Sequence, residues 1–436
     1  MDMLFKSVAL FLFIYSSKFK FGEVQFSTWE IGFAFFLILY IIKRYFYKEK
    51  REGWKTKYFY PWWILEIATC LFSVFWSVLR ALNNTELSGS SITSLLSPFI
   101  FIIFALIAPV MILYVYDDFW QFLYSLMYIN LFQSLFCIVE LRWMPLKMWL
   151  NDHIVNEGNI SYLVLYRAKG IGGEGAGLSV AMAFGILAAC IILVGKEKKL
   201  KYYIYIFIML ISLILVGRTG IYVSVVFLAV LIYVNMKNNR NTFSSIKIHV
   251  STIKFFMLLS AIVFSFLLWM FLSYDFMAIL QEHNLGSAYG RIGQTYKISG
   301  FMEDFLSWSF PPINMDSILG YGVRTYYSEN GLTYGDNGYI INTLIYGYLV
   351  GSIRYTVLAF YLYNLWLPCK YLKYGKLLGL LIPLAYILNI KEQFIQYNYM
   401  IFYISVIFMF YSTTKNKEMK MTIHDFLNDK IVNLKG

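Results

Sequence analysis

Residues 175–195 read GAGLSVAMAFGILAACIILVG, and this uncharged stretch decides the class of the fold. About 20 consecutive apolar residues are what a helix needs to cross the hydrocarbon core of a bilayer. A segment that spans lipid must be helical or part of a closed barrel, because lipid cannot satisfy exposed backbone N–H and C=O groups. The stretch ends at Lys196-Glu-Lys-Lys-Leu-Lys201, a basic run typical of the cytoplasmic end of a span.

Similar apolar segments recur along the chain, which has 436 residues and is 59% hydrophobic. The sequence predicts an all-α integral membrane protein with about 12 transmembrane helices in one polytopic domain, residues 1–436. The first segment is expected to be a retained helix rather than a signal peptide, because no small-residue cleavage site follows it. The expected spans are residues 3–17, 28–46, 59–80, 96–116, 119–141, 175–195, 202–216, 220–236, 255–274, 338–366, 377–390 and 395–412.

Basic residues gather in alternate links between these spans, and most of them are lysines. The positive-inside rule places such links, and with them both termini, in the cytoplasm. The net charge of +12 then reflects cytoplasmic loops near anionic headgroups rather than binding to nucleic acid. Two longer links, 142–174 and the large loop 275–337, are expected on the extracytoplasmic side. The basic links are residues 43–57, 196–201, 237–254, 370–376 and the cytoplasmic tail 413–436.

Several arginines lie in the links expected on the outer side of the membrane, where the positive-inside rule predicts few basic residues. A guanidinium group is a planar fork that binds phosphate or carboxylate through two hydrogen bonds, whereas an ammonium group is a point charge. The pattern therefore indicates an anionic ligand at the outer face. The arginines in the outer links are Arg80, Arg142, Arg167, Arg218, Arg291 and Arg324.

Arg167 opens a glycine-rich stretch that leads into the span 175–195, and Lys169 follows it closely. Glycine lets the backbone approach a ligand and adopt positive φ. One interpretation is therefore a contact with phosphate or sugar, and the other is a flexible outer loop. The stretch is not a P-loop, because no Gly-Lys-Ser/Thr follows. Its glycines are Gly170, Gly172, Gly173, Gly175 and Gly177.

Two further arginines lie beside or within apolar runs. Arg218 occupies the short link 217–220, where it either reaches lipid headgroups or points into a cavity as part of a functional site. Arg354 falls well inside the span 338–366, where a charge that is neither paired nor hydrated costs several kcal/mol. We expect Arg354 to extend toward the inner membrane surface rather than to act in catalysis.

The large loop carries Arg291 and Arg324, and it ends in Gly335-Asp-Asn-Gly-Tyr339 before an apolar run. Asp336 and Asn337 would cap the helix that starts there, because short polar side chains accept its free N–H groups. Asp336 could alternatively accept a proton from an incoming hydroxyl group. No histidine pair has metal-ligand spacing and the cysteines lie in or beside apolar segments, so no bound metal is expected.

In this order, the motifs resemble the O-antigen ligase and polymerase superfamily of bacterial surface-polysaccharide assembly. The resemblance rests on residues 167–177 and 217–220, on Arg291, on Leu319-Gly-Tyr-Gly322 and on residues 336–339. It implies a metal-independent membrane glycosyltransferase without a cofactor, located in the bacterial plasma (inner) membrane. Such a polymerase joins undecaprenyl-diphosphate-linked oligosaccharide repeat units into the O-antigen of lipopolysaccharide or into capsule. Its implied partners are the lipid-linked oligosaccharide, membrane lipid and a chain-length regulator protein.

The resemblance also implies roles for individual residues. Asp336 would be the catalytic carboxylate. Ligases of the superfamily usually place a histidine where this chain has Asp336 and Asn337, which favours a polymerase. A ligase and a flippase are the alternatives, although a flippase should have two related halves. The donor diphosphate would be bound by Arg167, Arg218, Arg291 and Arg324. The residues expected to support the site are Lys169, Gly172, Gly173, Tyr321 and Asn337.

The predicted topology can be tested with reporter fusions that are active on only one side of the membrane. Fusions at Gly300, in the large loop, and at Lys417, in the tail, should give opposite signals, because an odd number of expected spans separates them. A fusion at Lys199 should match the one at Lys417. Equal signals at Gly300 and Lys417 would contradict the orientation.

Overall fold

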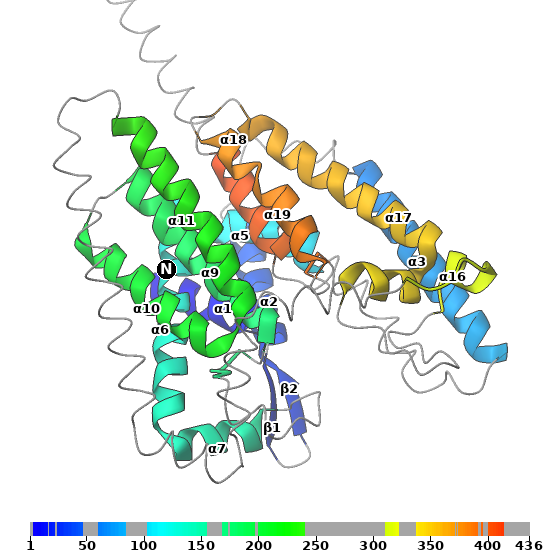
Figure 1. Cartoon of the computed structure of the whole chain (residues 1–436), viewed down its shortest axis with the longest axis horizontal. Coiled ribbons are helices and arrows are strands. Elements are labelled where there is room, and N and C mark those ends of the chain that lie inside the picture. Colours follow the sequence, from blue (N-terminus) through cyan, green and yellow to red (C-terminus); the bar gives the residue numbers. More distant parts are fainter. Residues whose placement is uncertain are drawn as a thin grey trace, which may run out of the picture. The chain divides into compact units, whose positions relative to one another are not determined.

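The structure of the chain, a computed structural model, is mostly helical (Figure 1). The expected span 255–274, most of the loop 275–337 and the tail from residue 414 on lie outside the residues that the structure describes. The described residues are 3–15, 17–21, 24–46, 60–83, 103–154, 168–172, 175–196, 199–239, 310–321, 337–370, 372, 374–390, 394–395 and 400–413.

Among the described residues, three helices are long and apolar enough to cross a membrane: Phe119–Glu140, Gly177–Gly195 and Gly338–Cys369. Each of the other expected spans, apart from 255–274, overlaps a shorter helix. The expected span 28–46 coincides with Thr28–Ile41 and the π-helix Ile42–Phe46. The remaining shorter apolar helices are Met3–Ile14, Pro61–Trp76, Ala105–Val115, Leu200–Val216, Thr219–Leu231, Gly375–Leu388 and Met400–Thr413.

The chain folds into two compact units that are interleaved along the sequence. Unit 1 comprises Met1–Phe35 and Trp120–Glu303, and unit 2 comprises Phe36–Phe119 and Asp304–Gly436. Each unit combines an early part of the chain with a later one. The packing of each unit therefore depends on contacts between residues that are far apart in the sequence.

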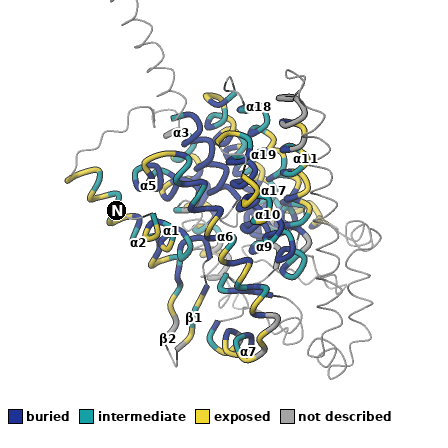
Figure 2. The backbone as a smooth tube through the Cα atoms, turned by 90° about the vertical axis from the view of Figure 1, so that its left-hand side faces the viewer, coloured by how far each residue is buried: buried dark blue, intermediate teal, exposed yellow. Residues whose placement is uncertain are grey.

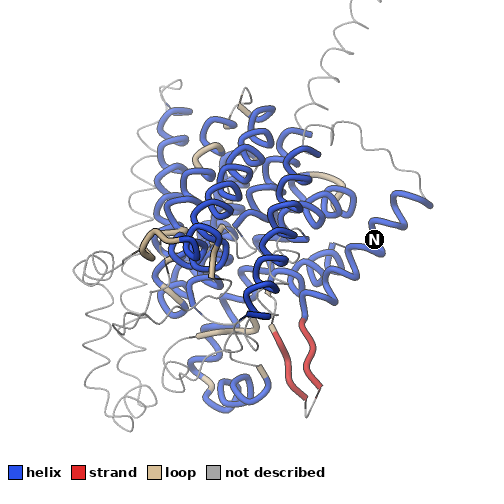
Figure 3. Tube along the Cα trace, turned by 90° about the vertical axis from the view of Figure 1, so that its right-hand side faces the viewer, coloured by secondary structure: helices blue, strands red, loops and turns tan. Residues whose placement is uncertain are grey.

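Unit 1 contains a β-hairpin, which departs from the all-α expectation. Lys18-Phe-Lys-Phe21 and Val24-Gln-Phe-Ser27 both alternate polar and apolar residues, the period-two pattern of a strand. The two strands pair antiparallel, with Lys18 opposite Ser27 (Figure 3). The elements of unit 1 are α1 (Met3–Ile14), β1 (Lys18–Phe21), β2 (Val24–Ser27), the first part of α2 (Thr28–Ile41), α6 (Phe119–Arg142), α7 (Met144–His153), α9 (Gly175–Gly195), α10 (Leu200–Val216) and α11 (Arg218–Asn239).

Helix α9 is the most enclosed of the three long apolar helices, with 83% of its apolar window buried against 56% in each of the other two. It packs against both α10 and α11. A Cβ atom at Gly185 would overlap the side chain of Asn130 on α6, and one at Gly220 of α11 would overlap the backbone of Ser179 on α9. Small residues thus let these helices approach closely, as in membrane helix bundles.

Unit 2 is organised around α17, which contacts α3, α16 and α19 (Figure 1). The elements of unit 2 are the end of α2 with the π-helix Ile42–Phe46, α3 (Tyr60–Asn83), the π-helix Ile103–Ile107, α5 (Ala108–Val115), α16 (Met315–Leu319), α17 (Gly338–Trp366), the 3₁₀ turn Leu367–Cys369, α18 (Gly375–Leu378), α19 (Leu381–Leu388) and the helix Met400–Thr413.

Helix α17 differs from the single continuous helix that the sequence predicts over 338–366. Gly347 has φ +77° and ψ 170°, which interrupts the helix. The hydroxyl group of Tyr355 donates a hydrogen bond to the carbonyl of Gly338 at 3.2 Å, although a straight helix would separate these residues by about 25 Å. The first piece, 338–346, therefore folds back against the second piece, 348–366. Together with Leu367–Cys369, the second piece still has about the 20 residues of a span.

The segment 310–321 packs into the turn between the two pieces of α17. Gly320 has φ +95°, and a Cβ atom at Gly320 or at Gly347 would overlap the backbone of the facing segment. The N–H group of Tyr321 donates to the carbonyl of Leu344, just before the turn, at 2.7 Å. Only glycine combines positive φ with such a close approach of two backbones at little cost.

The polar and apolar side chains of α3 are arranged in the opposite way to those of a helix in a soluble protein. A soluble helix turns its apolar stripe toward the core and its polar face toward water. In α3 the large side chains exposed outward are apolar, whereas several of the buried ones are polar, which is the arrangement expected of a helix that faces lipid. The exposed side chains are Ile64, Leu65, Ile67, Leu71, Phe72, Phe75, Val78 and Leu79, and the buried polar ones are Glu66, Thr69 and Ser73.

Candidate functional site

The residues predicted to form the site fall into two clusters, one in each unit, and are partly described. Lys169 and Gly172 belong to unit 1, where Arg218 is the first residue of α11. Tyr321 and Asn337 belong to unit 2. The predicted residues that lie outside the described part of the chain are Arg167, Gly173, Arg291, Arg324 and Asp336.

Glu140, near the end of α6, anchors residues 168–172 of the glycine-rich stretch. One carboxylate oxygen, Oε2, accepts hydrogen bonds from the N–H groups of Lys169 at 3.1 Å and of Gly170 at 2.6 Å. Glu140 is fully buried, and Lys169 is 1% exposed. Hydrogen bonds to an ionised acceptor are stronger than those between neutral groups. Residues 168–172 are therefore held in place, which argues against a flexible loop for this part of the stretch.

Two glycines of this segment pack against α6 and α1. Gly170 has φ +55°, and a Cβ atom there would overlap the side chain of Gln133. A Cβ atom at Gly172 would overlap the ring of Tyr15, whose hydroxyl group donates to Oδ1 of Asn130 at 2.6 Å. Packing alone thus requires glycine at both positions, whether or not a ligand binds.

The same segment reaches the ends of α10 and α11. The N–H group of Ala168 donates to the carbonyl of Leu215, near the end of α10, at 3.1 Å. In the first turn of α11, the N–H group of Gly220 donates to Oγ of Ser179 on α9 at 3.0 Å. The N-terminal ends of α9 and α11 therefore lie side by side. Helix N-termini carry partial positive charge and unsatisfied N–H groups, which favour anions.

Two lysines are buried in this region of unit 1. Lys147 of α7 is fully buried and interacts electrostatically with Glu140, while its neighbours Met148 and Trp149 are exposed, so buried and exposed positions alternate along this helix (Figure 2). Lys169 is the second buried lysine. The cluster thus combines two ammonium groups, one carboxylate and two helix N-termini. Glu140 was not predicted from the sequence, although an acidic residue near the end of an apolar run is a usable signal.

In unit 2, Asn337 caps the first piece of α17. Its Oδ1 atom accepts hydrogen bonds from the N–H groups of Tyr339 at 2.9 Å and Ile340 at 3.3 Å. The predicted capping role is thereby confirmed for Asn337. Because one side chain already serves two of the free N–H groups, the helix does not need Asp336 as its cap.

Three tyrosines surround this helix start. The ring centroids of Tyr339 and Tyr355 are 5.0 Å apart, and those of Tyr355 and Tyr386 are 6.2 Å apart. Nδ2 of Asn389 donates a hydrogen bond to the hydroxyl group of Tyr355 at 2.7 Å. The backbone carbonyl of Asn389 accepts a hydrogen bond from the N–H group of Gly338 at 2.9 Å. The hydroxyl groups of Tyr339 and Tyr386 donate to the backbone carbonyls of Tyr386 and Tyr355 at 2.8 and 2.7 Å, so internal hydrogen bonds hold these rings in place. This cluster was not predicted from the sequence, because it forms only when α17 folds back.

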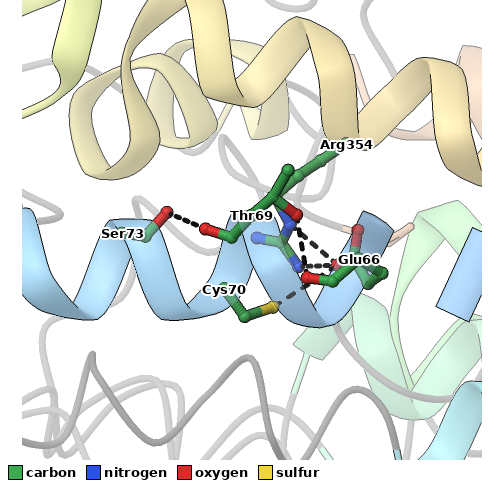
Figure 4. Close-up of polar contacts among 5 residues, drawn as sticks. All are labelled: Glu66, Thr69, Cys70, Ser73 and Arg354. Atoms are coloured by element: carbon green, nitrogen blue, oxygen red, sulfur yellow. Dashed lines mark hydrogen bonds and ion pairs between the residues drawn. The ribbon is translucent and has the colours of Figure 1, made fainter. Parts of the chain in front are cut away.

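Arg354 forms a buried ion pair with Glu66 of α3 (Figure 4). Nε and Nη2 of Arg354 donate to Oε1 of Glu66 at 2.8 and 2.7 Å, and Sγ of Cys70 lies 3.7 Å from the same oxygen. Arg354 is 4% exposed and Glu66 is 5% exposed. The expectation that Arg354 extends to the inner membrane surface is therefore wrong. Its partner lies 288 positions away in the sequence, so no local pattern indicates the pair.

Replacing Glu140 with Ala should release residues 168–172, because two buried N–H groups lose their acceptor at a cost of about 1–3 kcal/mol each. Trypsin cleaves after accessible lysines, so the purified variant should be cut after Lys169 and the wild-type protein should not. Mass spectrometry of the fragments identifies the cut. The matched control is Asp152→Ala on the exposed face of α7, which should give the wild-type pattern. Protection of Lys169 in Glu140→Ala would contradict the anchoring role.

Comparison of the chain with known protein families, characterised proteins and solved structures finds no match.

Proposed function

We propose that this chain is a membrane glycosyltransferase that polymerises undecaprenyl-diphosphate-linked oligosaccharide repeat units into O-antigen or capsule. In this proposal the chain has about 12 spans, with both termini in the cytoplasm and the site at the outer face of the bacterial plasma membrane. The observation that carries the proposal is the anchoring of residues 168–172 by Glu140. Bidentate binding of a diphosphate by arginine requires a fixed backbone, and this anchor directly follows Arg167 in the sequence.

The neighbouring helix start supports the same assignment. Ala168 follows Arg167, and it is bonded to Leu215, which precedes Arg218 by three positions. Arg218 opens α11, whose N-terminal end lies beside that of α9. An anionic group in this region would meet the N-terminal ends of α9 and α11, which lie close to Arg167 and Arg218 in the sequence. This combination suits the diphosphate of a lipid-linked donor.

Contacts between helix ends in unit 1 agree with the side of the membrane proposed for each link. Phe19 of the hairpin, proposed to lie outside, forms a β-bridge with Ile154 of the outer link 142–174. At the opposite ends of the helices, Lys196 lies 5.6 Å from the ring centroid of Trp120. Both of these residues belong to helix ends proposed to face the cytoplasm. Residues assigned to one side thus contact each other, as a membrane topology requires.

Unit 2 shows the same segregation of helix ends. Lys43 forms a salt bridge of 2.8 Å with Asp117, and both belong to links proposed to be cytoplasmic. Near the proposed outer end of α3, Nε1 of Trp76 donates to the carbonyl of Gly320 in the large loop at 3.0 Å. The exposed apolar side chains of α3 further support a membrane environment.

The proposed reaction is a direct transfer of the glycan. A hydroxyl oxygen of the acceptor sugar forms a bond to C1 of the donor sugar, and the bond from C1 to the diphosphate oxygen breaks. Asp336 takes the hydroxyl proton, and undecaprenyl diphosphate leaves with the electron pair. The arginines stabilise the charge that develops on the diphosphate. Capping by Asn337 supports a chemical role for Asp336, because the helix has its cap already.

Replacing Arg167 or Arg218 with Ala should shorten or abolish the polymer, with a loss of rate on the order of 10²–10³. Lys at either position should restore only part of the activity, because it lacks the bidentate fork. The same is expected for Arg291 and Arg324. Surface polysaccharide on a gel, from cells in which the variant replaces the wild-type gene, gives the chain length.

Arg80→Ala is the matched control for these variants, since Arg80 lies on the proposed outer side without an assigned role and should leave the chain length unchanged. Full-length polymer in all four Ala variants would mean that these arginines only anchor the chain at lipid headgroups. Deletion of the whole gene should leave single repeat units on the acceptor. Loss of every unit from the acceptor would instead indicate a ligase, and absence of product outside the cell would indicate a flippase.

Asp336→Asn should lose activity nearly as severely as Asp336→Ala, by a factor on the order of 10²–10⁴, while the amount of protein in the membrane stays normal. Asn keeps the capacity to cap a helix but cannot take a proton. As a comparison, Asn337→Ala should lower the stability by about 1 kcal/mol, measured by thermal unfolding in detergent, because it removes the observed cap. Wild-type activity in Asp336→Asn would exclude the proton-accepting role.

A further inference from the structure

We propose that Arg354 is a positioning residue that keeps the first piece of α17 folded back within the membrane and so fixes the place of its Asn337 end. The consequence for catalysis rests on the proposed function, because Asp336 precedes Asn337 in the sequence. The structural part of the proposal is that Arg354 clamps the folded-back first piece of α17, and it can be tested without an activity assay.

The clamp is a single side chain that joins three helical pieces. Arg354 belongs to the second piece of α17 and pairs with Glu66 of α3 through two hydrogen bonds to one oxygen (Figure 4). Its guanidinium carbon lies 4.2 Å from the ring centroid of Tyr346, at the end of the first piece. A desolvated cation over an aromatic ring is attracted to its face. Arg354 therefore holds the first piece directly, and Glu66 fixes the guanidinium group.

The contacts between the two pieces of α17 show beside which residues of the second piece the first piece begins. Gly338 lies opposite Tyr355, and a Cβ atom at Gly351 would overlap the side chain of Asn342. Tyr355 is eight positions beyond Gly347, so the helix start lies about 12 Å along the second piece from the turn. The turn contacts Gly320, which is bonded to Trp76 in the outer part of α3. The Asn337 end is therefore recessed from the turn toward the middle of α3.

A recessed helix start at membrane depth needs internal partners, because lipid offers none. Asn337, Asn389 and the hydroxyl group of Tyr355 supply them. Such a site limits access of water, which would compete with the acceptor hydroxyl group for the donor sugar. Fixing this end would thus favour transfer to sugar over hydrolysis.

The contact between α3 and α17 does not depend on the ion pair alone. Trp62 and Phe360 stack with ring centroids 5.0 Å apart and an interplanar angle of 4°, further along the same two helices. Phe360 belongs to the second piece, so this stack holds α3 without touching the first piece. Arg354 therefore has a separate role, which is to hold the first piece of α17 in position. The stack also provides a matched control.

The decisive variant removes both charges together, as Glu66→Leu with Arg354→Met. Replacing a buried ion pair by apolar residues of similar size is often neutral for stability, so insertion and the thermal midpoint should match wild type. Spin labels on Ile341→Cys and Thr356→Cys report the fold-back, since the four native cysteines are buried. A straight helix would place these positions about 22 Å apart. In the protein that keeps both native charges, the distances between the two labels should be narrowly distributed around a shorter value. In the double variant, these distances should be longer and more broadly distributed.

Polymer synthesis should fall in the double variant by a factor on the order of 100, because a misplacement of about 1 Å can cost that much. The control with Trp62→Leu and Phe360→Leu should keep both the label distance and the chain length. An unchanged distance in the Glu66 and Arg354 double variant would overturn the clamp. A changed distance with full-length polymer would overturn its role in positioning. If the wild-type chain makes no polymer, the proposed function fails, while the label distances still decide whether the clamp exists.

Discussion

A polar group that is buried away from water needs a partner, and in each unit of this chain one buried carboxylate supplies that partner at a contact between distant segments. In unit 1, Glu140 accepts the N–H groups of Lys169 and Gly170 and thereby ties the glycine-rich stretch to α6. In unit 2, Glu66 accepts hydrogen bonds from Nε and Nη2 of Arg354 and ties α3 to α17. Removing either carboxylate would leave buried donors without an acceptor, which explains why an acidic residue is placed within an otherwise apolar helix.

The distribution of polar and apolar side chains follows from the same constraint. Water does not drive helices together inside lipid, so in the proposed membrane protein close packing of small residues and polar pairs must hold them. Gly185 and Gly220 provide the close packing in unit 1, and α3 turns Glu66, Thr69 and Ser73 inward in unit 2. The proposed function uses this polar interior. Anchored backbone near helix N-termini suits a diphosphate, and a recessed helix start suits a transfer from which water is excluded.

Part of the candidate site was predictable because its signals are local. The cap at Asn337 follows from a short polar side chain directly before an apolar run. The pairing of Arg354 was not predictable, since its partner is 288 positions away and a lone arginine in a span has several ways to be satisfied. The tyrosines around Gly338 were missed for a related reason. Tyr339 and Tyr355 are 16 positions apart and meet only because the helix reverses at Gly347.

The sequence by itself indicated the apolar helices among the described residues, because a long apolar run must satisfy its backbone hydrogen bonds within itself when no water is present. It did not indicate the less apolar helices α7 and α16. Alternation of polar and apolar residues at 18–21 and 24–27 is also a local signal, although these two strands were not predicted from it. The tertiary structure alone decided the fold-back of α17 and the anchoring of residues 168–172. Both depend on contacts between distant segments, Gly347 with Gly320 and Glu140 with Gly170, and no local pattern specifies which distant group will satisfy a buried donor or fill a turn.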